Sequence, residues 1–356
     1  MPQKSIHSKI QRVILGETVN KVMGISEGKI LVTGGAGLIG SALVWALNRL
    51  GFRDIIVSDR LSDDGRYKNL VPLHFSDYVD ADDLMPYLKS DFAKDIRTIF
   101  HLGACADTME TDGRFLMKNN FEFTKNLAHH AENCALRFVY ASSAATYGDG
   151  TRGMDDEAPL QNLRPLNMYG YSKHLFDIYA QSRGMKLYGM KYFNVFGPNE
   201  AHKGPMISMV ARAYEQIRGE GEVRLFKSYR EDCGDGWQRR DFLYVKDAVD
   251  MTIFLGNVPE KINGRETAGI YNIGSGEART WLDLVRPIFE VLDKPWHVQF
   301  IEMPENLRTR YQYYTCANIQ KLRGIGYEKS LTPLEDALRD YVVNYLIPGK
   351  RLGEEE

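Results

Sequence analysis

The chain has 356 residues, of which 44% are hydrophobic and 26% charged, a balance that fits one large or two small folded domains and excludes a disordered chain. Its 45 lysines and arginines against 47 acidic residues give a formal charge of −2, which argues against nucleic acid or an anionic membrane as the partner and favours a small molecule. The four cysteines, none in a C-x-x-C pair, indicate reduced thiols in the cytoplasm: Cys105, Cys134, Cys233 and Cys316.

Residues 1–28 form a polar N-terminal extension that lacks the apolar stretch of a signal peptide. Its apolar residues allow either one docked helix or a frayed segment: Ile10, Val13, Ile14, Val22 and Met23. The longest apolar stretch, Ala36 to Leu47, is shorter than the ~20 residues that cross a bilayer, so no membrane span is expected.

From Lys29 onward, short apolar runs alternate with segments of helix length. This alternation predicts an α/β fold, a doubly wound parallel sheet of the Rossmann type. The expected strands are Lys29–Thr33, Asp54–Ser58, Thr98–Leu102, Arg137–Ser142 and Lys186–Phe193, and the expected helices include Ile39–Leu50 and Met117–Asn133.

The alternation weakens after Gly197-Pro198, where glycine-rich loops separate shorter elements. The sequence therefore predicts a nucleotide-binding domain over residues 29–197, with part of 240–275 returning to it. Residues 198–356 are expected to form mainly a smaller C-terminal substrate-binding domain.

The turn after the first expected strand reads Thr33-Gly34-Gly35-Ala36-Gly37-Leu38-Ile39-Gly40. Glycines at 34, 37 and 40 let the chain turn tightly, approach a pyrophosphate and pack the next helix close to the sheet. The amino end of that helix, at Leu38 and Ile39, offers free N–H groups to the same pyrophosphate. The turn therefore predicts a dinucleotide site.

The second expected strand leads into Asp59, placed where an acid binds the adenosine ribose hydroxyls. That acid alone suggests NAD. Arg60 follows directly and Arg66 lies a few residues on, so two guanidinium groups are available for a 2′-phosphate. NADP is therefore the predicted cofactor, with NAD as the alternative.

A Tyr-x-x-x-Lys motif places Tyr169 and Lys173 on one face of a helix. A phenol is a poor base at neutral pH, but a neighbouring ammonium and a nicotinamide cation are expected to lower its pKa. Lys173 is also placed to hold the nicotinamide ribose. Ser143, at the end of an expected strand, completes a Ser-Tyr-Lys set for hydride transfer.

Together, the glycine turn, Ser143, Tyr169 and Lys173 resemble the extended short-chain dehydrogenase/reductase family of nucleotide-sugar epimerases and dehydratases, from about Lys29 to Tyr345. The likeness is strongest to the branch of this family that inverts C6″ of ADP-heptoses. It implies an isomerase, an ADP-heptose substrate, NADP, a homo-oligomer and a product used for the lipopolysaccharide core. The motifs that carry it are His101–Cys105, Tyr140–Gly148, Leu166–Lys173, Tyr192–Pro198, His202–Gly204 and Arg310–Gln312.

In that branch C6″ is an unactivated carbon whose proton is not acidic, so inversion is expected to pass through a planar 6″-ketone. Rotation about the C5″–C6″ bond then presents the other face without moving the nucleotide. The resemblance implies that Lys203 acts as a second acid/base. It assigns the cofactor to Leu102, Gly103, Ala104, Cys105, Ala106, Asn119, Lys173, Val195 and Lys203, and the substrate to Ser143, Asn194, Phe226, Lys227, Arg240 and Tyr311.

Four features depart from the pattern of this branch. Leu102 stands where Glu is expected and Ala81 where a Lys supports the cofactor. Pro205 replaces a serine that contacts substrate, which removes a hydroxyl and a backbone donor. Residues 229–238 are an insertion ahead of Arg240. These changes leave the Ser-Tyr-Lys set for oxidation intact, but they affect which sugar the resemblance implies.

Three other functions are alternatives to C6″ inversion. A UDP-hexose 4-epimerase or another sugar-nucleotide dehydrogenase of this family needs only ring rotation and one acid/base. A 4,6-dehydratase needs an acid beside the active-site hydroxyl, where Ala144 and Ala145 stand. A non-catalytic dinucleotide sensor is disfavoured because the Ser-Tyr-Lys set is complete. His101 and Cys105 are interpreted as packing residues, and no cluster has metal-ligand spacing.

Overall fold

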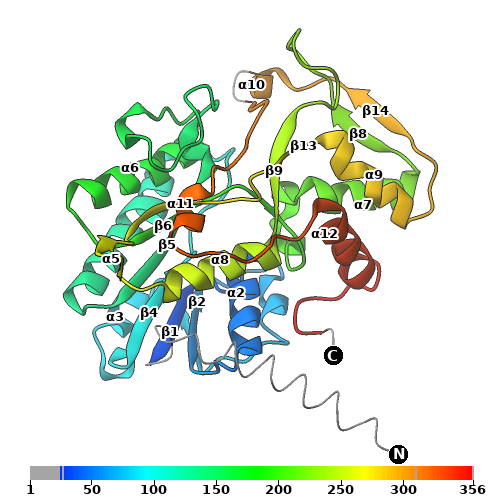
Figure 1. Cartoon of the computed structure of the whole chain (residues 1–356). Coiled ribbons are helices and arrows are strands. Elements are labelled where there is room, and N and C mark those ends of the chain that lie inside the picture. Colours follow the sequence, from blue (N-terminus) through cyan, green and yellow to red (C-terminus); the bar gives the residue numbers. More distant parts are fainter. Residues whose placement is uncertain (1–24, 26–27, 309–310, 355–356) are drawn as a thin grey trace, which may run out of the picture.

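The computed structural model describes residue 25, residues 28–308 and residues 311–354 (Figure 1). The expected helix over residues 10–23 lies outside these residues. Seven strands form one sheet in the order β12-β6-β5-β4-β1-β2-β3, and every neighbouring pair is parallel. Their bounds are β1 Lys29–Thr33, β2 Ile55–Asp59, β3 Asp77–Asp80, β4 Ile96–His101, β5 Arg137–Ser143, β6 Tyr188–Tyr192 and β12 Gly269–Ile273.

Helices cover both faces of this sheet because successive strand residues point to opposite sides. In β1, Ile30 and Val32 pack in one core with α2 and α8, whereas Leu31 packs in the other core with α5 and α6. Figure 1 shows α2 and α8 side by side across one face. The doubly wound α/β prediction is confirmed. The helices are α2 Leu38–Arg49, α5 Phe123–Asn133, α6 Met168–Ser182 and α8 Val245–Asn257.

The expected helix over Met117–Asn133 differs in detail. The structure places α4 at Gly113–Leu116, a π-helical turn at Met117–Glu122 and α5 after it. Asp112 begins α4 by accepting a hydrogen bond from the Phe115 N–H at 3.0 Å. The helical segment therefore starts earlier than expected, and the wide π-helical turn adds a residue within it.

The second part of the chain contains smaller sheets (Figure 1). The helix α9 begins at a capping box in which Thr280 and Asp283 satisfy each other's backbone N–H groups. The strands are β7 Asn194–Phe196, β8 Val223–Phe226, β9 Arg239–Tyr244, β10 Lys261–Ile262, β11 Arg265–Glu266, β13 Ala278–Thr280 and β14 Val298–Ile301. The remaining helices are α3 Leu84–Tyr87, α7 Met209–Glu220, α9 Trp281–Val291, α10 Glu305–Arg308, α11 Gln320–Gly324 and α12 Leu334–Tyr341.

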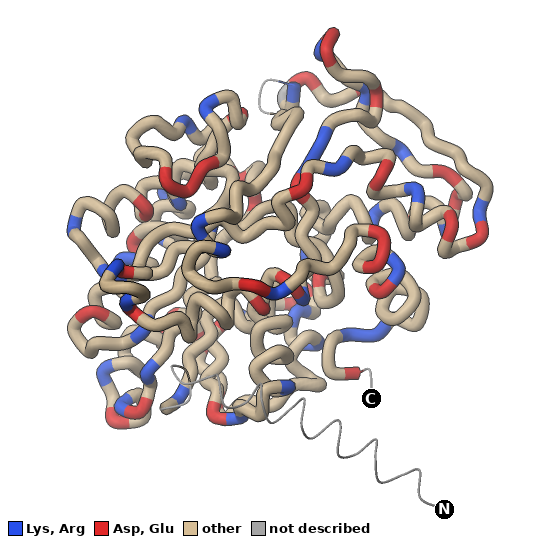
Figure 2. The backbone as a smooth tube through the Cα atoms, in the orientation of Figure 1, with Lys and Arg blue, Asp and Glu red and all other residues tan. Residues whose placement is uncertain are grey.

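The two parts of the chain are interleaved. After β9 the chain enters α8, which packs on α2, and then β12, which pairs with β6 at the edge of the large sheet. It crosses back into β13 and α9 afterwards. Lysine and arginine residues alternate with aspartate and glutamate residues along both parts of the chain (Figure 2). Among the described residues, no helix combines the length and apolarity that a bilayer crossing needs.

Candidate active site

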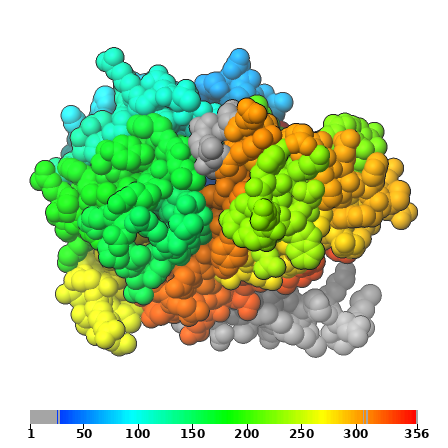
Figure 3. Space-filling model, turned by 90° about the horizontal axis from the view of Figure 1, so that it is seen from above, coloured from blue at the N-terminus to red at the C-terminus, as the bar shows by residue number. Residues whose placement is uncertain are grey.

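A cleft of about 850 Å³ opens at the carboxyl edge of the large sheet. Ser143 and Tyr169 line it, as do Ala81 and Pro205, two of the positions that depart from the family pattern. Seen from above, the described residues near 300–308 and 311–320 (orange) lie between the green residues of the first part of the chain and the yellow-green residues of the second (Figure 3). Every residue expected at the cofactor lines this cleft: Gly34, Gly37, Leu38, Ile39, Gly40, Asp59, Arg60, Arg66, Leu102, Gly103, Ala104, Cys105, Ala106, Asn119, Lys173, Val195 and Lys203.

The glycine turn has no room for side chains. A Cβ atom on Gly40 would lie 2.0 Å from the Gly34 carbonyl oxygen, and Gly34 itself has φ of +67°. Gly37 precedes α2 without any side-chain cap, so the first N–H groups of that helix stay available at the cleft. These features fit a pyrophosphate.

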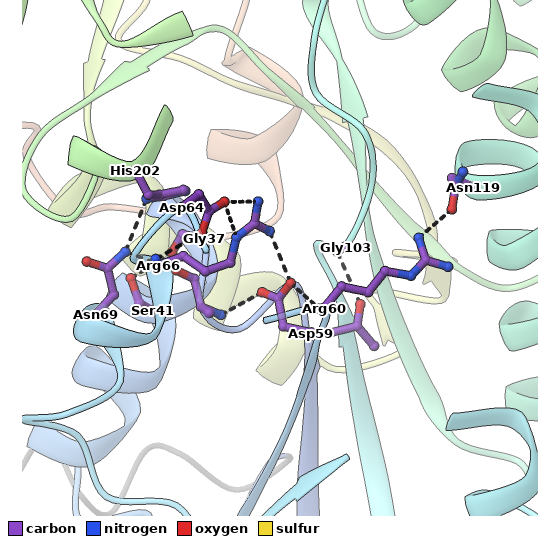
Figure 4. Close-up of polar contacts among 12 residues, drawn as sticks. Gly37, Ser41, Asp59, Arg60, Asp64, Arg66, Asn69, Gly103, Asn119 and His202 are labelled. Atoms are coloured by element: carbon purple, nitrogen blue, oxygen red, sulfur yellow. Dashed lines mark hydrogen bonds and ion pairs between the residues drawn. The ribbon is translucent and has the colours of Figure 1, made fainter. Parts of the chain in front are cut away.

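Asp59 organises the adenosine end of the cleft (Figure 4). One carboxylate oxygen accepts a hydrogen bond from the Ala36 N–H at 2.8 Å, and the other accepts one from the Arg60 N–H at 2.8 Å. Arg66 lies 3.3 Å from the same carboxylate and pairs with Asp64 at 2.6 Å, which lowers the pKa of Asp64. Asp59 therefore holds the glycine turn as well as lining the cleft.

The guanidinium of Arg60 points away from Asp59. It pairs with Asp82 at 2.6 Å and donates a hydrogen bond to the Asn119 side chain at 2.6 Å (Figure 4). Both arginines therefore line the cleft as expected, but each is already bonded to a carboxylate. A phosphate bound at this end must either share the two arginines with those carboxylates or replace the carboxylates as their partner.

Asn69 links two loops at the cleft, a role that the sequence interpretation missed. Its side-chain N–H groups reach the carbonyl oxygens of Ala36 and Asn199, each at 2.9 Å, and the ring of His202 at 3.3 Å (Figure 4). Asn69 thereby ties the glycine turn to the loop that carries Lys203. A single asparagine in a polar loop gave no signal of this in the sequence.

Tyr169 and Lys173 lie on one face of α6 as predicted, beside Ser143. Asn167 starts the helix by accepting a hydrogen bond from the Gly170 N–H at 2.7 Å, which sets the phase of this face. The Lys173 ammonium donates to the Ala141 carbonyl at 2.8 Å, and the Ser143 side chain lies close enough to the phenol to lower its pKa. Tyr169 is 9% exposed and Lys173 is 5% exposed.

Burial dominates the protonation of this pair in the protein alone. It raises the pKa of Tyr169, and the Ser143 hydrogen bond offsets only part of that rise. It lowers the pKa of Lys173 to about 8. Without the nicotinamide cation the phenol pKa is thus raised, because desolvation outweighs the effect of Ser143. The lowering expected when the nicotinamide is bound stays a prediction.

Lys203 reaches the same cleft from the loop at Ala201–Met206. Its ammonium lies 3.8 Å from Glu200, whose carboxylate is fully buried. Glu200 also accepts hydrogen bonds from the Ser208 N–H at 2.7 Å and the Tyr341 hydroxyl at 3.1 Å. Lys203 thus combines partial exposure with an anchored loop, as a proton donor or acceptor requires.

The residues expected at the substrate behave differently from those at the cofactor. Of the residues expected at the substrate, only Ser143 lines the cleft. Three of the others contact one another. Phe226 and Tyr311 pack edge to face with centroids 6.5 Å apart, and the Arg240 guanidinium lies 4.9 Å from the Tyr311 ring. Lys227 instead pairs with Glu302 at 2.6 Å, and Asn194 donates to the Asp241 carbonyl at 3.0 Å.

The insertion 229–238 projects as a finger beside this aromatic cluster (Figures 1 and 2). Tyr229 anchors its base, where the Tyr229 N–H donates to the Tyr313 hydroxyl at 2.9 Å. Arg308 stacks on the ring of Tyr229 with its guanidinium 3.8 Å from the centroid. Arg240 stays buried beneath the finger.

His101 packs as predicted. It is buried, and its two ring nitrogens hydrogen-bond to the hydroxyls of Thr33, 2.7 Å from Nδ1, and Thr124, 2.8 Å from Nε2. Burial lowers the pKa of His101 to about 3. Across residues 25, 28–308 and 311–354, no group of three histidine, cysteine or acidic side chains is arranged to hold a metal ion.

Known proteins share this sequence and fold. The model of the NAD dependent epimerase/dehydratase family matches residues 30–274. The ADP-L-glycero-D-manno-heptose-6-epimerase of Nitratidesulfovibrio vulgaris (strain DP4) is 47% identical over 320 residues, covering 89% of this chain and 97% of that protein. The crystal structure of the enzyme of that name from Helicobacter pylori superposes with a TM-score of 0.74 at 28% identity, covering 90% of this chain and 96% of that one.

A second solved structure is a UDP-N-acetylglucosamine 4-epimerase from Methanobrevibacter ruminantium M1, with a TM-score of 0.76 at 25% identity over 91% of this chain and 99% of that one. The fold alone thus accommodates epimerases of different sugars. The family match covers the sheet, the glycine turn and the Ser-Tyr-Lys set, and it confirms the resemblance drawn from those motifs. This chain belongs to the NAD-dependent epimerase/dehydratase family.

Proposed function

We propose that the protein is an ADP-L-glycero-D-manno-heptose 6-epimerase that inverts C6″ of ADP-D-glycero-D-manno-heptose. The observation that carries this function is the meeting of Tyr169, Lys173, Ser143 and Lys203 in the cleft with the glycine turn. The similarity to named heptose epimerases along almost the whole chain supports the sugar. The product serves assembly of the lipopolysaccharide core.

The residues of the cleft fit a nicotinamide dinucleotide, because Gly34 and Gly40 allow the tight turn and the uncapped amino end of α2 after Gly37 presents N–H groups to a pyrophosphate. Lys173 is placed to hold the nicotinamide ribose. When bound, the nicotinamide supplies the hydride acceptor and donor. Tyr169, supported by Ser143, takes the proton from the C6″ hydroxyl, so that the substrate passes through a 6″-ketone.

Rotation about the C5″–C6″ bond turns the ketone oxygen away from Tyr169. Lys203 lies on a different loop of the same cleft and supplies or takes the proton on that side. Its ammonium lies 3.8 Å from Glu200, and Asn69 and Ser208 fix the ends of the loop. The two groups therefore divide the proton transfers between the two faces of C6″.

Replacing Lys203 with Met is expected to slow epimerisation by about 100-fold, the lower range for loss of a general acid or base. Partial hydride transfer is expected to persist because Tyr169 remains. NMR of the epimers measures the first effect, and the near-ultraviolet absorbance of the reduced nicotinamide measures the second. Exposed Lys294→Met serves as the control. Unchanged epimerisation in the Lys203 variant would remove its role.

For the cofactor, we propose NADP rather than NAD. Two guanidinium groups lie at the Asp59 end of the cleft, and Arg66 can exchange a carboxylate for a 2′-phosphate. Arg66→Ala is expected to weaken NADP binding at least 10-fold and NAD binding less than threefold, as calorimetry would show. Exposed Arg53→Ala is the control. Tighter binding of NAD by the unmodified chain contradicts the assignment.

The sugar is tested by incubating the purified protein with ADP-D-glycero-D-manno-heptose and, separately, with UDP-glucose, and resolving the epimers by NMR. Conversion of the heptose alone is expected. Conversion of the hexose alone indicates the UDP-hexose 4-epimerase alternative, which has the same fold. Conversion of neither, with tight dinucleotide binding, indicates a sensor protein.

We further propose that the part of the chain after residue 197 holds the substrate, with Phe226, Arg240 and Tyr311 as its centre. These residues already pack together, and a buried guanidinium suits a diphosphate. A homo-oligomer follows from the resemblance, and light scattering tests it. Free thiols at all four cysteines suit the reducing cytoplasm.

A further inference from the structure

A buried carboxylate lies directly behind the proposed active site. Asp177 follows Lys173 by four residues on α6, so both side chains lie on the same face of the helix. Asp177 is 0% exposed. Its two oxygens accept hydrogen bonds from the Tyr140 hydroxyl at 2.9 Å and the Ser142 hydroxyl at 2.7 Å, both on β5. The catalytic Ser143 is the next residue of that strand.

A buried lysine faces the same carboxylate. Lys191 on β6 is 1% exposed, and its ammonium lies 3.8 Å from Asp177. Its ammonium has no hydrogen-bond partner among the described residues and lies 4.2 Å from the centre of the Tyr147 ring. Such a pair gains little net stability, because desolvation costs about as much as the attraction returns. Its place behind the cleft indicates a functional role.

Asp177 acts electrostatically on Lys173. Burial disfavours the Lys173 ammonium, and the carboxylate of Asp177 is the largest influence that favours it, raising its pKa against that burial. Lys191 has no resolved effect on Lys173. The other titratable groups that face this network are Tyr169 and His174 on α6, Tyr140 on β5, His101 on β4, Lys321 on α11, and Cys105, Tyr147 and Asp156 on neighbouring loops.

We propose that Asp177, held by Tyr140 and Ser142 and balanced by Lys191, is a positioning residue that keeps Lys173 protonated in the buried active site. The ammonium is needed to hold the cofactor ribose and to favour the phenolate of Tyr169. The kinetic consequence rests on the proposed function. The effect on dinucleotide affinity does not, because it requires no sugar.

The test measures NADPH affinity by fluorescence titration between pH 6 and pH 10. In the unmodified protein the affinity is expected to fall above about pH 8, where Lys173 loses its proton. Asp177→Asn removes the carboxylate at constant shape, so the fall is expected about one pH unit lower, with about fivefold weaker binding at pH 8 and nearly unchanged binding at pH 6. We call this fall in affinity with rising pH the limb. Lys173→Met is expected to remove the limb, which would identify Lys173 as its origin.

Asp177→Asn also leaves Lys191 buried without a counter-ion, which lowers the melting temperature. The double variant Asp177→Asn/Lys191→Met removes both charges. It is expected to recover the melting temperature while keeping the displaced limb. Exposed Asp95→Asn, the same substitution at a residue that does not line the cleft, is the matched control and keeps the limb at its original pH.

A limb that returns with the melting temperature in the double variant shows a structural role only and overturns the inference. So does a limb that Lys173→Met leaves in place. If the protein converts no ADP-heptose but shows the displaced limb, the proposed function fails and the inference stands. If the protein is an active heptose epimerase but Asp177→Asn leaves the limb at its original pH, the proposed function stands and the inference fails.

Discussion

Replacing Tyr169 with Phe is expected to lower the rate of epimerisation by about 1,000-fold, within the range for loss of a positioned general acid or base. The ring fills the same buried space, so the helix α6 and the Lys173 contact to Ala141 remain. Only the hydroxyl beside Ser143 disappears. NMR progress curves at saturating ADP-heptose measure the rate, and calorimetry with NADP is expected to show less than a threefold change.

Tyr171→Phe is the matched control for this variant. It changes the same atom on the same helix, but Tyr171 is 46% exposed and does not line the cleft. Its rate is expected to equal that of the unmodified protein. A Tyr169→Phe enzyme that kept a tenth or more of the activity would show that another group handles the proton.

Gly40→Ala is expected to abolish dinucleotide binding, with an affinity loss of at least 100-fold. The new methyl group would lie 2.0 Å from the Gly34 carbonyl oxygen and 2.8 Å from the Gly35 Cα, both of which are backbone atoms. Helix α2 must therefore move away from the turn and take its free N–H groups with it. Such overpacking also costs about 1–3 kcal/mol of stability.

Gly219→Ala gives the contrast, because the added methyl group meets no atom within 4 Å and the residue lies inside α7. It is expected to raise stability by about 1 kcal/mol and to leave dinucleotide affinity unchanged. Urea denaturation and calorimetry measure both variants. A Gly40→Ala protein that binds NADP normally would contradict the close packing of the turn.

The cofactor side could be predicted from the sequence because its residues follow a local rule. A buried strand, a glycine turn and a helix lie in consecutive order, and parallel strands bring their following loops to one edge. Once Lys29–Thr33 was recognised as a strand, the positions of Gly34, Asp59 and Leu102 followed. The strand β3, Asp77–Asp80, was missed because four residues with two acids carry no apolar period.

Contacts between distant segments could not be predicted. Asp177 and Lys191 lie on different elements, and each is a charged residue in an otherwise apolar run, a pattern typical of an exposed position. Asn69 meets Asn199 across 130 residues. The substrate side depends on how loops pack around the insertion, so Phe226 and Tyr311 could be paired only through the resemblance.

The return of α8 and β12 to the large sheet has a practical consequence for anyone dissecting this enzyme. A fragment ending at residue 197 would lack the helix that shields α2 and the strand that covers the outer edge of β6. It would present bare apolar surface and an open backbone ladder to water, both of which invite aggregation. The two halves are therefore best manipulated as one indivisible polypeptide.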